Sequence, residues 1–176
     1  MEACTAAHQR VLTAVCTLSD EQVRAPSLLP GWSRGHVITH LARNADSHVW
    51  LFDGARLGEV RSQYPQPGMR EADIEAGAPR SADELAHDLR RSCEALEQAW
   101  RDLDDDLWER GGEVTPGRRS MSELVFRRLR EVEVHHADLD VGYSSADWSS
   151  VYVERELRRR LAGLADRADH LSLIHI

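Results

Sequence analysis

The stretch REVEVHHADLD, residues 130–140, decides whether this chain is all-helical or contains a sheet. Its first part, EVEVH, alternates charged and apolar residues, a pattern typical of a strand. Over a longer window, the residues that recur at helical spacing are Leu124, Val125, Leu129, Val132 and His136, and no Gly or Pro interrupts residues 122–140. No second strand candidate offers this segment a partner. The sequence therefore predicts a helix here.

Similar helical patterns recur along the rest of the chain. Residues 3–17 form one amphipathic pattern, a second begins at the N-cap Ser33 and runs to about Arg56, and a third follows the N-cap Ser81. The segment SSADW, residues 144–148, starts a further helix that carries Val151, Val153, Leu157, Leu161 and Leu164. These patterns predict an all-α fold, a four-helix bundle.

A long connection separates the second and third predicted helices. From Gly58 to Arg80 the chain is rich in Pro, Gly and charged residues, and it contains Tyr64. Long connections in compact domains are often binding loops or lids. We expect this one to close over a site on the bundle; a solvated connector is the alternative.

The chain is expected to fold as one domain over residues 1–170. Its last residues, 171–176, belong to an apolar run, HLSLIHI, that does not continue the preceding Arg-rich pattern. We interpret 171–176 as a tail of doubtful origin.

Composition excludes several classes of function. With 22 Lys and Arg against 30 Asp and Glu, the net charge is −8, which argues against a nucleic-acid partner. No apolar run is long enough to span a bilayer, and the polar N-terminus does not resemble a signal peptide. Three widely spaced cysteines without a CxxC pair are typical of a reduced, cytoplasmic protein.

Two groups of residues have the spacing of metal ligands. On a helix, Glu131 and His135 project from one face, although such a pair is also common as a solvated surface contact. Upstream, His36, His40, Asn44 and His48 follow one another four residues apart along one helical face. One of these histidines together with Glu131 and His135 would give a His₂Glu set with an open position, as in catalytic zinc sites. Nickel, iron and manganese accept the same ligands.

Two longer motifs carry a resemblance to a known family. LPGWSRGHVITHLARNAD, residues 29–46, and LREVEVHHADLDVGYSSADW, residues 129–148, resemble the mycothiol-dependent maleylpyruvate isomerases, a branch of the DinB-like metal-binding bundles. The resemblance extends over roughly residues 3–165. It implies a four-helix bundle that holds a divalent metal, usually zinc, through His40, Glu131 and His135. It also implies a small C-terminal α/β domain, which this sequence lacks.

The activity implied by the resemblance is the isomerisation of maleylpyruvate to fumarylpyruvate with mycothiol as cofactor. A thiolate adds to the double bond, the resulting single bond rotates, and elimination gives the trans product, while the metal keeps the thiol deprotonated. Arg34, Arg43, Asn44 and Tyr64 are candidate catalytic residues, and Arg43 and Asn44 are candidate cofactor contacts. Both arginines could equally be solvated. His36 and His48 are expected to lie too far from Glu131 to share an ion with His40.

Other functions fit the same residues. A mycothiol S-transferase acting on electrophiles would use the same metal site, and a non-catalytic binding bundle would keep only the fold. The expected partners are a small-molecule thiol and a small diacid or electrophile, and the protein is expected to be a monomer or homodimer.

Overall fold

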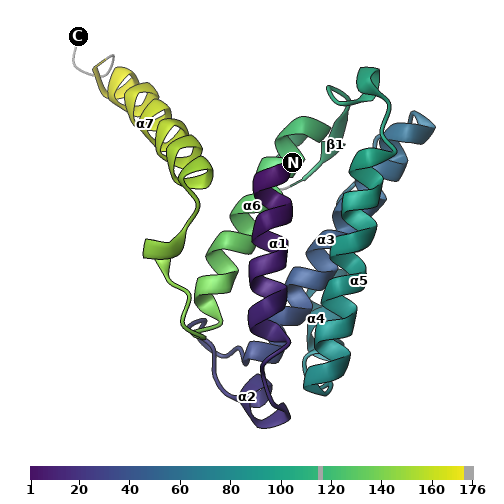
Figure 1. The fold of residues 1–176 in the computed structure, drawn as a ribbon. Helices are drawn as coiled ribbons and strands as arrows, with labels where there is room; N and C mark the ends of the chain where they lie inside the picture. The colour runs from purple at the N-terminus through teal and green to yellow at the C-terminus, as the bar shows by residue number, and fades with distance from the viewer. Residues whose placement is uncertain (115–116, 173–176) are drawn as a thin grey trace.

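The computed structural model describes residues 1–114 and 117–172; for residues 164–172 it describes the backbone alone. Four long helices form a bundle in which α1 and α3 occupy opposite corners, each packed against α5 and α6 (Figure 1). The elements are α1 (Glu2–Val15), α2 (Asp20–Arg24), α3 (Arg34–Leu57), α4 (Met69–Gly77), α5 (Ala82–Arg101), η1 (Asp105–Leu107), β1 (Gly111–Glu113), β2 (Arg118–Ser120), α6 (Met121–Asp138), η2 (Ser145–Asp147) and α7 (Ser150–Ser172). The prediction of a four-helix bundle is confirmed.

Serine caps fix where three of the bundle helices begin. Ser33, Ser81 and Ser120 each accept a hydrogen bond from the backbone N–H three residues on, and the side chain of that later residue accepts one from the serine backbone N–H. Such capping boxes satisfy backbone donors that a helix start leaves unpaired. The segment 130–138 belongs to α6, so the helical period correctly outweighed the local strand-like alternation.

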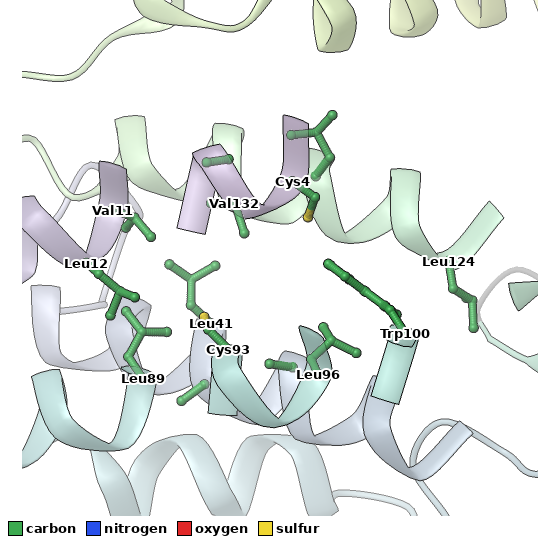
Figure 2. Close-up of a cluster of buried hydrophobic side chains, with 14 of the residues drawn as sticks. Cys4, Val11, Leu12, Leu41, Leu89, Cys93, Leu96, Trp100, Leu124 and Val132 are labelled. Atoms are coloured by element: carbon green, nitrogen blue, oxygen red, sulfur yellow. The ribbon is translucent and has the colours of Figure 1, made fainter. Parts of the chain in front are cut away.

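Apolar stripes of the four helices meet in one core. Leu41 of α3, Leu89 and Leu96 of α5 and Val132 of α6 are almost completely buried and point into the space between the helices (Figure 2). Burying each such leucine stabilises the fold by about 2 kcal/mol. The core therefore holds α3 and α6 in the fixed relation that the site below requires.

The predicted long connection between the second and third bundle helices is present, but its second part is helical. Helix α4 carries a single strongly apolar buried residue, Ile74, which gives too short a pattern to be recognised in the sequence. Helix α4 packs closely against the start of α3, and glycines make this close approach possible. A Cβ atom at Gly35 would collide with the Ala78 carbonyl, and one at Gly77 would collide with Thr39.

The sequence did not predict one further element, the hairpin, and it did predict the helix α7. Residues 111–120 include a short antiparallel hairpin in which Gly112 pairs with Arg119; three-residue strands leave no readable alternation. Helix α7 leaves the bundle after its first turns, at the upper left of Figure 1, and its apolar residues Val151, Val153, Leu157 and Leu161 are exposed. The side chain of Leu164 lies outside the described part of the structure, as do residues 173–176 of the predicted tail.

No helix in the described part of the chain is long and apolar enough to cross a membrane.

Candidate functional site

Three of the predicted site residues converge between α3 and α6. His40 projects from α3, and Glu131 and His135 project from α6, with one potential ligand atom of each lying within 4.8 Å of the others. His40 Nε2 lies 3.1 Å from Glu131 Oε2, and His135 Nε2 lies 3.5 Å from the same oxygen. The side chain of His40 is almost fully buried, whereas those of Glu131 and His135 are partly exposed. Two imidazoles and a carboxylate thus face a common point.

The charges of these three groups depend on one another. Burial alone would raise the pKa of Glu131, but hydrogen bonds from His135 and His40 bring it well below its usual range. Burial lowers the pKa of His40, against the opposing effect of its hydrogen bond to Glu131. Burial would also lower the pKa of His135, yet Glu131 and Asp138 raise it. The site thus combines an ionised carboxylate, a neutral imidazole and an imidazole that readily holds a proton.

Hydrogen bonds at the Nδ1 atoms, on the far side from Glu131, orient the rings of His40 and His135. His135 Nδ1 lies 2.8 Å from Asp138 Oδ2, so its Nδ1–H donates to that carboxylate and Nε2 faces Glu131. A carboxylate behind a histidine in this way is a recurrent feature of metal sites. Arg70 Nη2 donates to His40 Nδ1 over 3.3 Å, which places the ring proton of His40 on Nε2, toward Glu131. Trp32 packs against His40, with ring centroids 5.8 Å apart.

Two of the three converging residues, His40 and Glu131, line a cavity of about 550 Å³. Its walls come from α3, from α6, from the connection after α3 and from the first turn of α4. The lining residues are His40, Asn44, His48, Gln63, Tyr64, Pro65, Gln66, Pro67, Gly68, Arg70, Glu71, Arg127 and Glu131. The Pro-rich connection therefore forms part of the cavity wall. That it closes over an open metal position stays a prediction.

Asn44 lines the cavity and is held from behind by a buried arginine. Arg128 is fully buried, and its Nη1 donates to Asn44 Oδ1 over 2.9 Å and to the Leu41 carbonyl over 2.8 Å. Its Nε donates to His8, whose Nδ1 lies 2.8 Å from Glu97. The oxygen of Asn44 is thus engaged by Arg128, and the Asn44 amide also hydrogen-bonds Tyr64 at the cavity wall.

Tyr64 also lines the cavity, from the connection. Burial raises the pKa of Tyr64, while hydrogen bonding with the Ser47 side chain opposes that rise. The phenol is therefore neutral near pH 7 and can serve as a hydrogen-bond donor at the cavity wall.

The two predicted site arginines of α3 lie elsewhere, outside the residues that line the cavity. Arg34 donates to the carbonyls of Leu139 and Asp140 and so ties the start of α3 to the end of α6. Arg43 donates to both carboxylate oxygens of Asp88 on α5, each over 2.7 Å. Their positively charged groups are thus engaged in joining helices, and the geometry does not support the catalytic or cofactor contacts expected of them.

The other two histidines of the α3 stripe stay apart from the cluster. His36 accepts a hydrogen bond from the Ser33 backbone N–H and completes the helix cap. His48 is 1% exposed and lines the cavity beyond Asn44, and its Nδ1 has no hydrogen-bond partner among the described residues. Burial lowers the pKa of His48 to about 3, so the ring is neutral. Only His40 of this stripe reaches Glu131 and His135.

Sequence reasoning missed two residues beside the cluster. Asp138 stands three residues after His135, a helical spacing that could have identified it as the partner of that ring. Arg70 lies in the connection, where no periodicity indicates which way a side chain faces. Its position depends on how α4 packs against α3.

Comparison with known families agrees with this geometry. A family model described as the mycothiol maleylpyruvate isomerase N-terminal domain matches residues 4–140. The chain belongs to this family. The match includes all three converging residues, His40, Glu131 and His135.

Two solved structures resemble most of the chain. One is a crystal structure of the mycothiol-dependent maleylpyruvate isomerase, and the other is a histidine-to-alanine variant of that enzyme. Each superposes with a TM-score of 0.83 at 27% sequence identity, over 87% of this chain and 64% of the other. The chain thus spans less than two thirds of the length of these relatives. No curated protein sequence matches it significantly.

Proposed function

We propose that this protein is a metal-dependent, mycothiol-using isomerase that acts on a substrate of the maleylpyruvate type. The observation that carries the proposal is the convergence of His40, Glu131 and His135. His40 and Glu131 line a cavity that has arginines in its wall. Family membership supports the choice of thiol and substrate class.

The donor set fits a divalent metal. Two imidazoles and one carboxylate are the ligands of catalytic zinc sites that keep a position open, and the carboxylate behind His135 matches the second partner such sites use. His40, Glu131 and His135 would hold the ion. When bound, it would supply the positive charge that keeps a thiol deprotonated near pH 7. Zinc is our proposed metal.

Arg70 is suited to bind a carboxylate of the substrate. It lines the cavity, and its guanidinium lies beside His40. Its present hydrogen bond requires His40 Nδ1 to be unprotonated. A diacid substrate in the cavity needs a cationic partner, and a guanidinium binds a carboxylate through paired N–H donors.

The remaining cavity residues orient the bound molecules and exclude water. Asn44 presents an amide and Tyr64 presents a phenol at the cavity, and the neutral ring of His48 lines the same wall. Neutral donors and acceptors of this kind suit the hydroxyl and amide groups of a sugar-containing thiol. Pro65 and Pro67 stiffen the connection above them, which limits the entry of water that would weaken electrostatic contacts in the cavity.

One experiment tests the proposal against its two alternatives. Purified metal-loaded protein would be assayed with mycothiol and maleylpyruvate, and separately with mycothiol and monobromobimane. We expect thiol-dependent isomerisation that a chelator abolishes and added zinc restores. Conjugation of the bimane without isomerisation would favour a mycothiol S-transferase. Stable metal binding with neither reaction would favour a non-catalytic binding bundle and contradict the proposal.

A further inference from the structure

A second cavity, apart from the metal-ligand cluster, is lined by an unusual number of arginines. It measures about 500 Å³ and lies between β2, the first turns of α6 and the first turns of α7. Its lining residues are Arg119, Glu123, Phe126, Arg127, Arg130, Arg155 and Arg159. We call these five arginines the arginine cluster. In a chain with a net charge of −8, so many guanidinium groups around one cavity stand out.

Carboxylates neutralise only part of the arginine cluster. Glu156 accepts hydrogen bonds from both Arg130 and Arg159. Among the described residues, neither Arg119 nor Arg155 forms an ion pair: Arg119 donates to the neighbouring backbone carbonyl, and the guanidinium of Arg155 lies 4.2 Å from the centroid of the Phe126 ring. Two guanidinium groups from different elements thus border the cavity without a carboxylate partner.

The arginines of the cluster also repel one another. Arg127 is half-buried between the others, and burial together with the charges of Arg130 and Arg119 lowers its pKa. Like charges held this close destabilise the fold unless something compensates them. Anchoring contacts hold the cluster in place, because the first turns of α7 pack Tyr152 and Arg155 against Phe126. A bound anion would relieve the repulsion.

We propose that the arginine cluster is a binding site for a small anion that carries carboxylate or phosphate groups. Guanidinium groups match both kinds of oxyanion with paired N–H donors, and several converging on one cavity select for more than one negative charge. Arg127 lines this cavity and the metal-side cavity alike, so it lies between the two. The proposal does not depend on the function proposed above, since it needs neither metal nor thiol.

An NMR titration of the metal-loaded protein tests this site. Inorganic phosphate and succinate would be added separately in a low-salt chloride buffer, while the Nε–H signals of Arg119 and Arg155 are followed. We expect saturable shifts at both arginines with at least one probe, and a loss of affinity when salt is raised. Saturation by phosphate alone would identify a phosphate site, and saturation by succinate alone a carboxylate site. Absence of saturable shifts with both probes would overturn the proposal.

Two variants from different elements locate the binding. Arg119→Ala removes a guanidinium of β2, and Arg155→Ala combined with Arg159→Ala removes two from α7. Each should weaken binding of the probe by about tenfold or more, because charge-assisted hydrogen bonds are lost. Arg101→Ala, an exposed arginine at the end of α5, is the matched control and should leave the affinity unchanged. Equal affinity in all the variants would place the anion elsewhere and contradict the proposal.

Discussion

Helix α6 carries two glutamate–histidine sets that face different parts of the molecule. Glu131 and His135 face His40 of α3 and are both partly exposed, and Glu131 lines the cavity. Glu133 and His136, one or two residues away, are buried against α1 and the segment before α7. Burial lowers the pKa of His136 to about 4, while carboxylates raise that of its neighbour His135 against the effect of burial. Adjacent residues of one type thus have opposite shifts.

The difference between the two faces lies in how their hydrogen bonds are satisfied. Glu133 accepts hydrogen bonds from Arg10, from the Tyr143 hydroxyl and from the Ser149 backbone N–H. The ring of His136 stacks on Tyr143 with centroids 3.9 Å apart. These partners fill the surroundings of that face, so it fastens the chain after α6 to the bundle. The Glu131 face instead turns its donor atoms toward one another beside a cavity, which suits it to a ligand.

Removing the imidazole of His40 should have the largest effect. His40→Ala should lower the mycothiol-dependent isomerisation rate by about a thousandfold, because the charge stabilisation that a bound metal supplies is worth several kcal/mol. His36→Ala, one turn earlier on α3 and outside the cavity, is the control and should keep most of the activity. Steady-state kinetics would measure both, and comparable losses in the two variants would contradict the separate roles assigned to these histidines.

Changing the carboxylate of the other face should affect stability instead. Glu133→Gln should lower the free energy of unfolding by about 2–3 kcal/mol, since Arg10 and Tyr143 lose a charged partner in a buried setting. Urea denaturation would measure this loss. If stability stayed the same while activity disappeared, Glu133 would belong to the site rather than to the bundle.

The carboxylate behind His135 should have an intermediate effect on the site alone. Asp138→Asn should weaken metal affinity by about 10–100-fold, because partners of this kind orient the ligand and raise its basicity. Competition with a fluorescent zinc chelator would give the affinity. An unchanged value would show that Asp138 only terminates the helix.

The smallest effect at neutral pH concerns His136. Its lowered pKa means that the unfolded chain takes up a proton before the folded one does. The difference in pKa therefore favours the folded state fully above about pH 6.5. This contribution to the free energy of unfolding, up to about 3 kcal/mol, is lost as the pH falls toward 4. His136→Phe should keep the stack on Tyr143 and change stability by less than about 1 kcal/mol at pH 7.5.

Thermal unfolding from pH 7.5 to 4.5 would measure the contribution of His136. The variant should lose less stability than the wild type across this range. His87→Phe, an exposed position on α5, is the control and should follow the wild-type curve. Parallel curves for the wild type and His136→Phe would show that His136 does not cause the acid sensitivity.

Much of this architecture follows from local sequence signals. Helical periodicity predicts all four bundle helices, and the serine caps predict where α3 and α5 begin. Four-residue spacing predicts that Glu131 and His135 share a face. Periodicity cannot reveal elements that bury too few side chains, such as α4 and the hairpin. For α7 it predicts the helix correctly, but it does not reveal that the apolar residues of this helix are exposed.

Individual polar contacts were the least predictable part of the site. Arg34 and Arg43 lie close to His40 in the sequence, yet their guanidinium groups reach the end of α6 and Asp88 of α5. Arg70, thirty residues from His40, is the arginine that contacts it. A long flexible side chain can reach in many directions, and only tertiary packing selects one.

The central claim is that the Glu131 face of α6 holds a metal ion and the Glu133 face does not. Elemental analysis of protein purified without chelators and dialysed against zinc would test it in the matched pair Glu131→Gln and Glu133→Gln. We predict about one ion per chain in the wild type and in Glu133→Gln, and close to none in Glu131→Gln. Equal metal content in the two variants, or a wild type that binds none, would contradict the claim.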